Sequence, residues 1–224
     1  FENVAEVMYS VTHMVMGVAP YGVFALIAGT AAKFGLSILA PFAKVIFAVY
    51  IGCILHALIV YSGMIVAFCR KSPAWYFKGV QEACITAFVT RSSSGTLPVT
   101  LANVRDNLGV SEGVSSFVLP LGATINMDGT ALYQGVCALF VAQAFNIPLT
   151  LQMQIGIVVT ATLASVGTAG VPGAGLIMLT MVLTSVGLPI EGIALVAGID
   201  VILDAARTCL NVAGDTAVCA EVAS

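Results

Sequence analysis

The stretch from Ala43 to Cys69 constrains the fold most, because it is apolar over more than the ~20 residues that an α-helix needs to cross a bilayer. Its only polar interruptions of note are Lys44 and His56. Transmembrane β-strands are shorter and alternate with period two, so this run predicts a helix. Only 8% of the 224 residues are charged, against about 25% in soluble domains. We therefore expect an all-α polytopic membrane protein.

Composition also excludes some partners and sites. The eight lysines and arginines form no patch, so nucleic acid is not an expected partner. The cysteines lack CxxC spacing, and we interpret them as small buried apolar residues rather than as a disulfide or zinc framework. They are Cys53, Cys69, Cys84, Cys137, Cys209 and Cys219. The chain begins with Phe1 rather than methionine, and we interpret it as a fragment of a longer protein.

The connection after Cys69 carries Arg70, Lys71 and Lys78, and such clusters gather on the cytoplasmic side of membranes. Arg105 and Asp106 indicate a second connection on the same side. The segment between them is broken by "RSSSGTLP" (91–98) and is too polar for one spanning helix. It predicts a re-entrant hairpin with its tip at 91–98, which is tolerated at membrane depth only inside protein or beside a wet cavity.

The same pattern recurs later in the chain. A second apolar stretch, 152–189, is broken by "GTAGVPGAG" (167–175). Each broken stretch precedes a spanning segment with acidic residues: 113–145, which we expect Gly129 and the Asn-Met-Asp bend to open, and 190–222. One spanning segment separates the hairpins, so they open to opposite sides. This is an inverted repeat, which points to a binding site near the midplane, as in secondary transporters.

The last segment carries its polar residues on one face. At 100° per residue, five of them fall in a stripe about 80° wide. They are Asp200, Asp204, Arg207, Asn211 and Asp215. Charges inside a membrane are costly unless they face a polar interior, so the stripe predicts a cavity. Three carboxylates against one arginine leave negative charge that favours cations. For Asp200, a structural role is as well supported as a functional one.

The chemistry of these side chains suggests a ligand. The planar fork of Arg207 suits a carboxylate, and neighbouring Asp204 suits an ammonium group, so the pair could hold an acidic amino acid by both ends. Carboxylate and amide oxygens of Asp215, Asp128 and Asn126 suit Na⁺. Backbone N–H groups at the first hairpin tip would stabilise an anion. We interpret His56 as a packing polar group rather than a proton relay.

Four motifs, "RSSSGTLP", "GATINMDGTALYQG", "SVGTAGVPGAG" and "DAARTCLNVAGD", occur in this order. They resemble the dicarboxylate/amino acid:cation symporter family, which includes the excitatory amino-acid transporters, and its prokaryotic branch in particular. The resemblance implies a glutamate-transporter-like fold without its first four helices, a homotrimer in the full-length form, and a multi-pass protein of the cell inner membrane. It implies a scaffold helix at 1–36 and a transport domain at 37–224. The parts of that domain are a transmembrane helix at 43–69, hairpin 1 at 74–104, an unwound helix at 113–145, hairpin 2 at 152–189 and a polar-striped helix at 190–222.

The resemblance also implies site residues. Arg207 would grip the side-chain carboxylate of the substrate and Asp204 its amino group. Further substrate ligands would be Asn211, Thr208, Thr130, Ser93, Gly170, Val171 and Gly175. The co-transported ion would be Na⁺, held at three sites. The first would comprise Asp215, Asn211, Asn126 and Gly122; the second Thr124, Met127, Ser165, Val166 and Thr168; the third Asp128 with Asn126.

Departures within the family narrow the function. Neutral exchangers lack the arginine matched by Arg207, and C4-dicarboxylate carriers lack the aspartate matched by Asp204. Vertebrate members carry a proton-coupling glutamate where Gln134 stands. We therefore predict sodium-coupled symport of aspartate or glutamate, not an enzyme. The alternatives are a proton-coupled symporter, a C4-dicarboxylate carrier, an ion channel, or an intramembrane aspartyl protease using Asp128 and Asp215, whose "GxGD" motif is absent.

Overall fold

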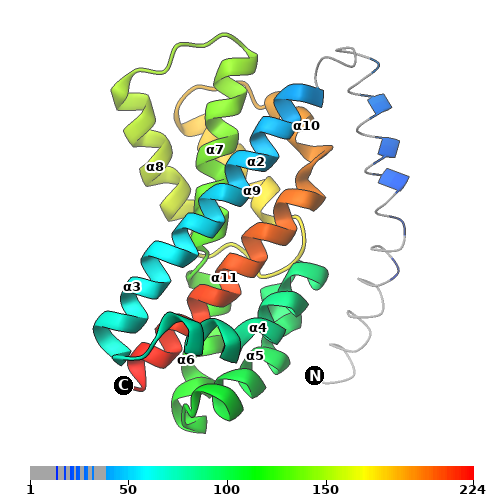
Figure 1. The fold of residues 1–224 in the computed structure, drawn as a ribbon. Helices are drawn as coiled ribbons and strands as arrows, with labels where there is room; N and C mark the ends of the chain where they lie inside the picture. Colours follow the sequence, from blue (N-terminus) through cyan, green and yellow to red (C-terminus); the bar gives the residue numbers. More distant parts are fainter. Residues whose placement is uncertain are drawn as a thin grey trace.

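The computed structural model describes residues 39–224 and a few isolated positions between Met14 and Ala32. The helix predicted at 1–36 lies outside the described residues. Over 39–224 every regular element is helical and no strand is present, which confirms the all-α prediction (Figure 1).

The first long helix runs without a break to Cys69, as α2 (Leu39–His56), η2 (Ala57–Tyr61), α3 (Ser62–Met64) and η3 (Ile65–Cys69). Over the described residues it is the one helix long and apolar enough to cross a membrane. The sequence predicted a spanning helix here but not its two π-helical stretches, η2 and η3, in which hydrogen bonds join residues five apart.

Helices α4 (Pro73–Thr90) and α5 (Ser93–Leu108) form the first hairpin. The turn between them is only Arg91 and Ser92, with Arg91 in a left-handed conformation (φ 55°). The predicted tip at 91–98 was therefore too long, because Pro98 lies inside α5. The hydroxyl of Ser92 caps α5 by accepting from Gly95 N, and Pro98 then removes one intrahelical hydrogen bond without ending the helix.

Helices α6 (Glu112–Ile125) and α7 (Asp128–Ala144) are separated by the non-helical pair Asn126–Met127. The break falls where the sequence predicted it, but the role given to Gly129 was wrong. Gly129 lies in the first turn of α7, and a Cβ on it would collide with the backbone of Arg207. This glycine therefore serves close approach between two helices rather than unwinding.

Helices α8 (Leu151–Ser165) and α9 (Ala174–Ser185) form the second hairpin, whose tip 166–173 is non-helical. The break matches the predicted "GTAGVPGAG" closely. Gly167 and Gly173 have φ of 97° and 78°, which explains the need for glycine at both positions. We call residues 166–173 the tip loop.

The segment predicted as one helix over 190–222 is divided into α10 (Gly192–Ala197) and α11 (Asp200–Val222), so the polar stripe lies entirely on α11. Helix α11 packs against α2, α4, α5, α6 and α7, and it runs through the middle of the bundle (Figure 1). Each of the five polar residues of the stripe is buried. Because α11 has neighbours on all sides, its polar face contacts the non-helical segments that interrupt the other helices.

Candidate functional site

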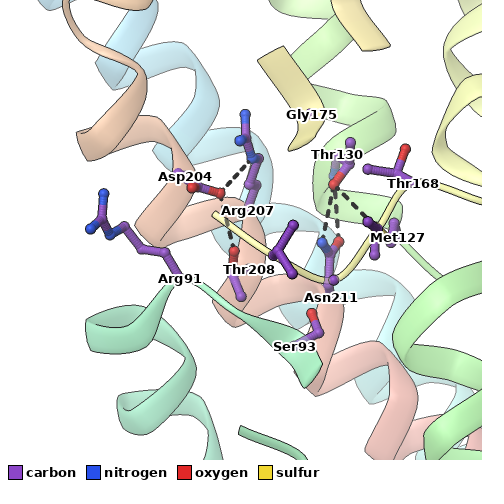
Figure 2. A pocket seen from close by; sticks show the side chains of 13 residues that line it. Arg91, Ser93, Met127, Thr130, Thr168, Gly175, Asp204, Arg207, Thr208 and Asn211 are labelled. Atoms are coloured by element: carbon purple, nitrogen blue, oxygen red, sulfur yellow. Dashed lines mark hydrogen bonds and ion pairs between the residues drawn. The ribbon is translucent and has the colours of Figure 1, made fainter. Parts of the chain in front are cut away.

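A small cavity lies where the breaks of several helices meet the polar face of α11 (Figure 2). It is lined by Arg91, Ser93, Met127, Thr130, Thr168, Ala169, Gly170, Val171, Gly175, Asp204, Arg207, Thr208 and Asn211. All nine residues predicted as substrate ligands are in this lining. The volume is about 10 Å³, which is room for roughly one water molecule, so the cavity is too small for an amino acid.

Arg207 is the largest fully buried side chain in the described part of the chain. Its Nε donates to Asp204 Oδ1 (2.8 Å) and its Nη1 to Asp200 Oδ1 (3.0 Å). The guanidinium lies 4.3 Å from the ring centre of Tyr133, a favourable cation–π contact. Its Nη2 has no hydrogen-bond partner within the described residues. One unsatisfied donor on a buried cation is costly unless a ligand completes it.

The ion pair gives Asp200 a clear structural position, which the sequence left open between a structural and a functional role. Tyr133 was not identified from the sequence at all, although it lies one turn after Gly129 on α7. Gly175 at the start of α9 has no room for a side chain, because a Cβ there would lie 2.9 Å from Arg207 Cζ. The guanidinium is thus enclosed by α11, α7 and α9.

Both carboxylate oxygens of Asp204 accept hydrogen bonds in the cavity. Its Oδ1 accepts from Arg207 Nε and from Thr208 Oγ1 (3.3 Å), and its Oδ2 accepts from the backbone N–H of Gly173 (3.1 Å). The last contact fastens the tip loop to α11.

The two hairpin tips also touch each other. The carbonyl of Gly170 accepts from Ser92 Oγ (2.7 Å) and from Ser94 N (3.2 Å). A Cβ on Gly170 would lie 2.7 Å from Ser94 Oγ and 2.9 Å from the carbonyl oxygen of Ala123. The tip loop therefore covers the cavity at a position that only glycine can occupy.

Arg91 lines the cavity from the first hairpin tip and was missed as a site residue. The sequence placed it at the tip but assigned it no role. The available signal was a single cation at a helix break directly before the "SSS" run, at the same level as Asp204. Its presence adds a second positive charge to the cavity lining.

The first predicted cation site is brought together only in part. Asn126 Nδ2 donates to Asp215 Oδ1 (3.1 Å), and a Cβ on Gly122 would lie 2.6 Å from that oxygen. Asn211 points elsewhere: its Oδ1 accepts from Gly129 N (2.8 Å) and its Nδ2 donates to Thr130 Oγ1 (3.1 Å). Asn211 thus caps the start of α7 while the other three residues cluster at the end of α6.

The second predicted cation site joins the ends of α6 and α8. The N–H of Gly167 donates to the carbonyl of Thr124 (2.9 Å), and the N–H of Thr168 donates to the carbonyl of Ser165 (3.3 Å). Met127 presents its sulfur to Thr130 Oγ1 at 3.8 Å. Val166 ends α8, and its N–H donates to the carbonyl of Thr162 (3.3 Å). Two helix C-termini meeting in this way concentrate negative carbonyl dipoles, an environment that favours a cation.

Asp128, the predicted centre of the third cation site, contacts the spanning helix. Its Oδ2 accepts from Tyr61 Oη (2.9 Å) and lies 3.2 Å from His56 Nε2. His56 and Tyr61 are five residues apart, which would place them about 140° apart on an α-helix. The π-helical turn η2 brings them to the same side, because residues five apart are bonded in it. No residue pattern in the sequence indicates this turn.

The Asp128 and Asp215 clusters are adjacent. A Cβ on Gly214 would lie 2.6 Å from Tyr61 Oη and 2.8 Å from Asn126 Nδ2. Gly214 on α11 therefore lies next to both Tyr61, which donates to Asp128, and Asn126, which donates to Asp215. Oxygen and amide groups supply the polar contacts of both clusters, with His56 as the exception.

Comparison with known proteins gives consistent results. The profile of the "Sodium:dicarboxylate symporter family" matches residues 1–224. The chain is 42% identical over 215 residues to "Proton/glutamate-aspartate symporter" of Escherichia coli (strain K12), covering 96% of this chain and 49% of the relative. It is 42% identical over 218 residues to "Excitatory amino acid transporter 1" of Homo sapiens, covering 40% of the relative, and equally to "Excitatory amino acid transporter 2" of Mus musculus, covering 38%.

The chain thus spans half or less of the length of these curated relatives. Its match to the family is nevertheless continuous from the first residue to the last. The four motifs that carried the resemblance all lie at the helix breaks and on α11, where the cavity forms. This chain belongs to the sodium:dicarboxylate symporter family, a family of transporters.

Proposed function

We propose that the protein containing this chain is a secondary active transporter that carries aspartate or glutamate across a membrane together with Na⁺, by alternating access. The observation that carries this proposal is the buried Arg207–Asp204 pair inside a small cavity at the meeting point of two helical hairpins. The names of the relatives support the substrate, since the bacterial one is a glutamate-aspartate symporter.

Substrate recognition follows from the donors and acceptors on α11. The carboxylate of an acidic side chain takes the open Nη2 of Arg207 and replaces one of its aspartate partners, which gives a bidentate contact. The ammonium group takes Asp204 Oδ2 when the N–H of Gly173 leaves it. Thr208, Asn211, Thr130 and Ser93 offer further polar contacts, so both ends of an acidic amino acid are recognised.

Opening of the tip loop admits the substrate. The cavity has room for about one water molecule, so an amino acid enters only if part of the lining moves. The tip loop is the longest non-helical segment of that lining, and it carries Gly170 and Val171. We assign it the role of the outer gate.

Sodium coupling rests on the oxygen-rich clusters beside the cavity. Asp215 with Asn126 and Gly122, the meeting ends of α6 and α8, and Asp128 are the proposed ion sites. Gln134 is fully buried; its Nε2 donates to Gly175 O (3.4 Å) and its Oε1 has no partner among the described residues. A non-titrating amide here carries no proton. The name of the bacterial relative makes proton coupling the second candidate.

We further propose the arrangement that the family resemblance implies for the full-length protein. Residues 1–36 form a scaffold helix and 37–224 a transport domain, with both hairpins re-entrant in the bilayer. The spanning helix at 40–69 and the apolar outer faces of α8 and α9 suit contact with lipid or with other helices. The assembly is a homotrimer in the cell inner membrane.

The deciding experiment is uptake by the full-length protein in proteoliposomes. An inward sodium gradient should drive accumulation of labelled aspartate or glutamate but not of succinate, which lacks the amino group. Accumulation that ignores sodium and follows a proton gradient would replace the coupling ion. Accumulation of succinate in preference to both amino acids would make the protein a C4-dicarboxylate carrier instead.

A further inference from the structure

Tyr61 is a buried tyrosine of the spanning helix to which the proposed function gives no role. It is the last residue of the π-helical turn η2 and is only 1% exposed. Its hydroxyl reaches acceptors on two other helices: Asp128 Oδ2 at the start of α7 (2.9 Å) and the carbonyl oxygen of Leu210 on α11 (3.2 Å). Single π-helical turns inside α-helices are frequent at functional sites, which makes this contact a candidate for a functional one.

The hydroxyl of Tyr61 cannot donate fully to both acceptors at once. A tyrosine hydroxyl carries one proton, so it donates one hydrogen bond, while its oxygen can also accept. An ionised carboxylate is the better acceptor, because hydrogen bonds to charged groups are roughly twice as strong as neutral ones. The proton of Tyr61 therefore points to Asp128 while that carboxylate has no cation, and the carbonyl of Leu210 is the second choice.

The two acceptors belong to one ring of contacts that reaches the substrate cavity. The carbonyl of Leu210 is part of the peptide group that leads into Asn211, and Asn211 lines the cavity. Asn211 Oδ1 accepts from the N–H of Gly129 (2.8 Å), which is in the peptide group that follows Asp128. Tyr61 and Asn211 therefore join the start of α7 to α11 from two sides. A change at Asp128 can thus reach Asn211 through the hydroxyl of Tyr61.

The surface of α11 leaves space for this hydroxyl. A Cβ on Gly214 would lie 2.6 Å from Tyr61 Oη, so the tyrosine oxygen can approach the helix only because a glycine stands there. The ring of Tyr61 packs edge to face on His56, with 5.0 Å between the ring centres. The ring is thereby held in place, while the hydroxyl hydrogen can still rotate about the C–O bond. Such a hydroxyl can change its acceptor without any movement of the side chain.

We propose that Tyr61 is a positioning residue that couples cation binding at Asp128 to the position of Asn211, and so to substrate affinity. This inference rests on the proposed function, in which Asp128 is a sodium site. A cation on Asp128 balances the charge of the carboxylate and repels the hydroxyl hydrogen, which turns to the carbonyl of Leu210. The bond to Leu210 then holds the turn of α11 that carries Asn211. The hydroxyl keeps its proton throughout, so only a hydrogen bond changes.

The test measures aspartate binding to the purified full-length protein by isothermal titration at a low and at a high sodium concentration, with choline replacing sodium. The ratio of the two dissociation constants measures the coupling between the two ligands. Tyr61→Phe keeps the ring and removes the hydroxyl, and we expect it to lower this ratio by roughly tenfold. Aspartate affinity at low sodium should change by less than about twofold. All titrations use one pH, because His56 Nε2 also lies 3.2 Å from Asp128 Oδ2.

Two other tyrosines provide matched controls. Tyr50, on the same helix as Tyr61, donates to the carbonyl of Ile202 (3.0 Å), and the buried Tyr76 donates to the carbonyl of Ala213. Both acceptors are on α11, and within residues 39–224 neither of these two hydroxyls is hydrogen-bonded to a carboxylate. Tyr50→Phe and Tyr76→Phe each lose the same kind of hydrogen bond, and both should leave the ratio within about twofold of its original value.

The possible outcomes distinguish a coupling role from a structural one. A loss of aspartate affinity that is equal at both sodium concentrations would make Tyr61 a structural residue only and would overturn the proposal. An unchanged ratio in Tyr61→Phe, or an equal fall of the ratio in either control, would also overturn it. If the unmodified protein binds aspartate equally well at both sodium concentrations, the proposed function itself fails and the coupling fails with it.

Discussion

The two helical hairpins have the same outline but different attachments. Both α4 and α5 pack along α11, whereas α8 and α9 pack on α7 and on each other. The first hairpin turns in two residues, Arg91 and Ser92, while the second needs the long non-helical tip loop with two glycines at positive φ. The first hairpin is therefore built as a fixed wall of the site, and the second as a cover.

The energetics of the cover fit this difference. Hydrogen bonds hold the tip loop in place. The N–H of Gly173 donates to Asp204, and the N–H of Gly167 donates to the carbonyl of Thr124. The carbonyl of Gly170 accepts from the hydroxyl of Ser92 and from the N–H of Ser94. Each such bond contributes a net ~0.5–1.5 kcal/mol. Opening the cover thus costs a few kcal/mol, whereas moving the wall would expose the buried cluster of Ala83, Ala87 and Val212.

The largest expected effect is on the fixed side of the site. Arg207→Lys keeps a positive charge beside Asp200 and Asp204 but loses the fork that grips a carboxylate. We expect aspartate affinity in the full-length protein to fall by roughly 100-fold, about the value of two charge-assisted hydrogen bonds. Isothermal titration measures it, with the melting midpoint as control for folding. Unchanged affinity would remove Arg207 from the substrate site.

On the cover side, Gly170→Ala should be the next most severe change. Its Cβ would meet Ser94 Oγ and the Ala123 carbonyl, so the tip loop could not close. We expect aspartate affinity to fall by roughly 10-fold, a cost of about 1.4 kcal/mol. The matched control is Gly135→Ala, since that glycine has no neighbour within 4 Å of the added Cβ. Equal effects of the two substitutions would contradict the assignment of the cover.

Much of this contrast between hairpins was visible in the sequence. The positions of both breaks, the polar face of α11 and nine of the thirteen residues that line the cavity followed from glycines, prolines, charge spacing and the family motifs. The predicted length of the first tip was too great. In the sequence Pro98 looks like a helix breaker, but a proline near the capped start of a helix is tolerated. Cap and break cannot be told apart until the hydrogen bond from Gly95 to Ser92 is seen.

Other features of the site had no local signal. The π-helical turn η2 brings His56 and Tyr61 to Asp128 because it contains one more residue than an α-helical turn. No residue type in the sequence predicts such an extra residue. The contact of Arg207 with Tyr133 joins distant segments, so it depends on how helices pack rather than on spacing. Gly129 was assigned to unwinding because its tight neighbour, the Arg207 backbone, lies on another helix.

Ion binding offers a test that involves both the wall and the cover. Asp215 lies beside Asn126 at the end of α6, and the same helix end contacts the tip loop through the bond from Gly167 N to Thr124 O. Asp215→Asn should lower the apparent sodium affinity of aspartate uptake by about 10-fold, since a carboxylate ligand becomes a neutral amide. Aspartate affinity at saturating sodium should stay within a few-fold. Sodium dependence identical to that of the unmodified protein would exclude Asp215 from the ion site.

The smallest effect should come from the bond that joins the two hairpins. Ser92 Oγ donates to Gly170 O at 2.7 Å, and its loss should speed opening of the cover. Ser92→Ala should raise the rate of aspartate dissociation by about threefold, in line with one neutral hydrogen bond worth ~0.5–1 kcal/mol. Stopped-flow fluorescence from a reporter on the tip loop would measure this rate.

Ser94→Ala is the matched control, because its bond to Gly170 uses the backbone N–H and survives the substitution. Ser92 Oγ also caps α5 by accepting from Gly95 N. Ser92→Ala therefore weakens the first hairpin as well as the bond to Gly170 O, which we call the latch. Ser92→Thr separates the two roles, since a threonine keeps the capping oxygen and crowds the approach to Gly170. If dissociation accelerates in Ser92→Ala but not in Ser94→Ala, the latch belongs to the first hairpin and only the second hairpin moves. If both accelerate equally, the tips open together and the distinction between wall and cover fails.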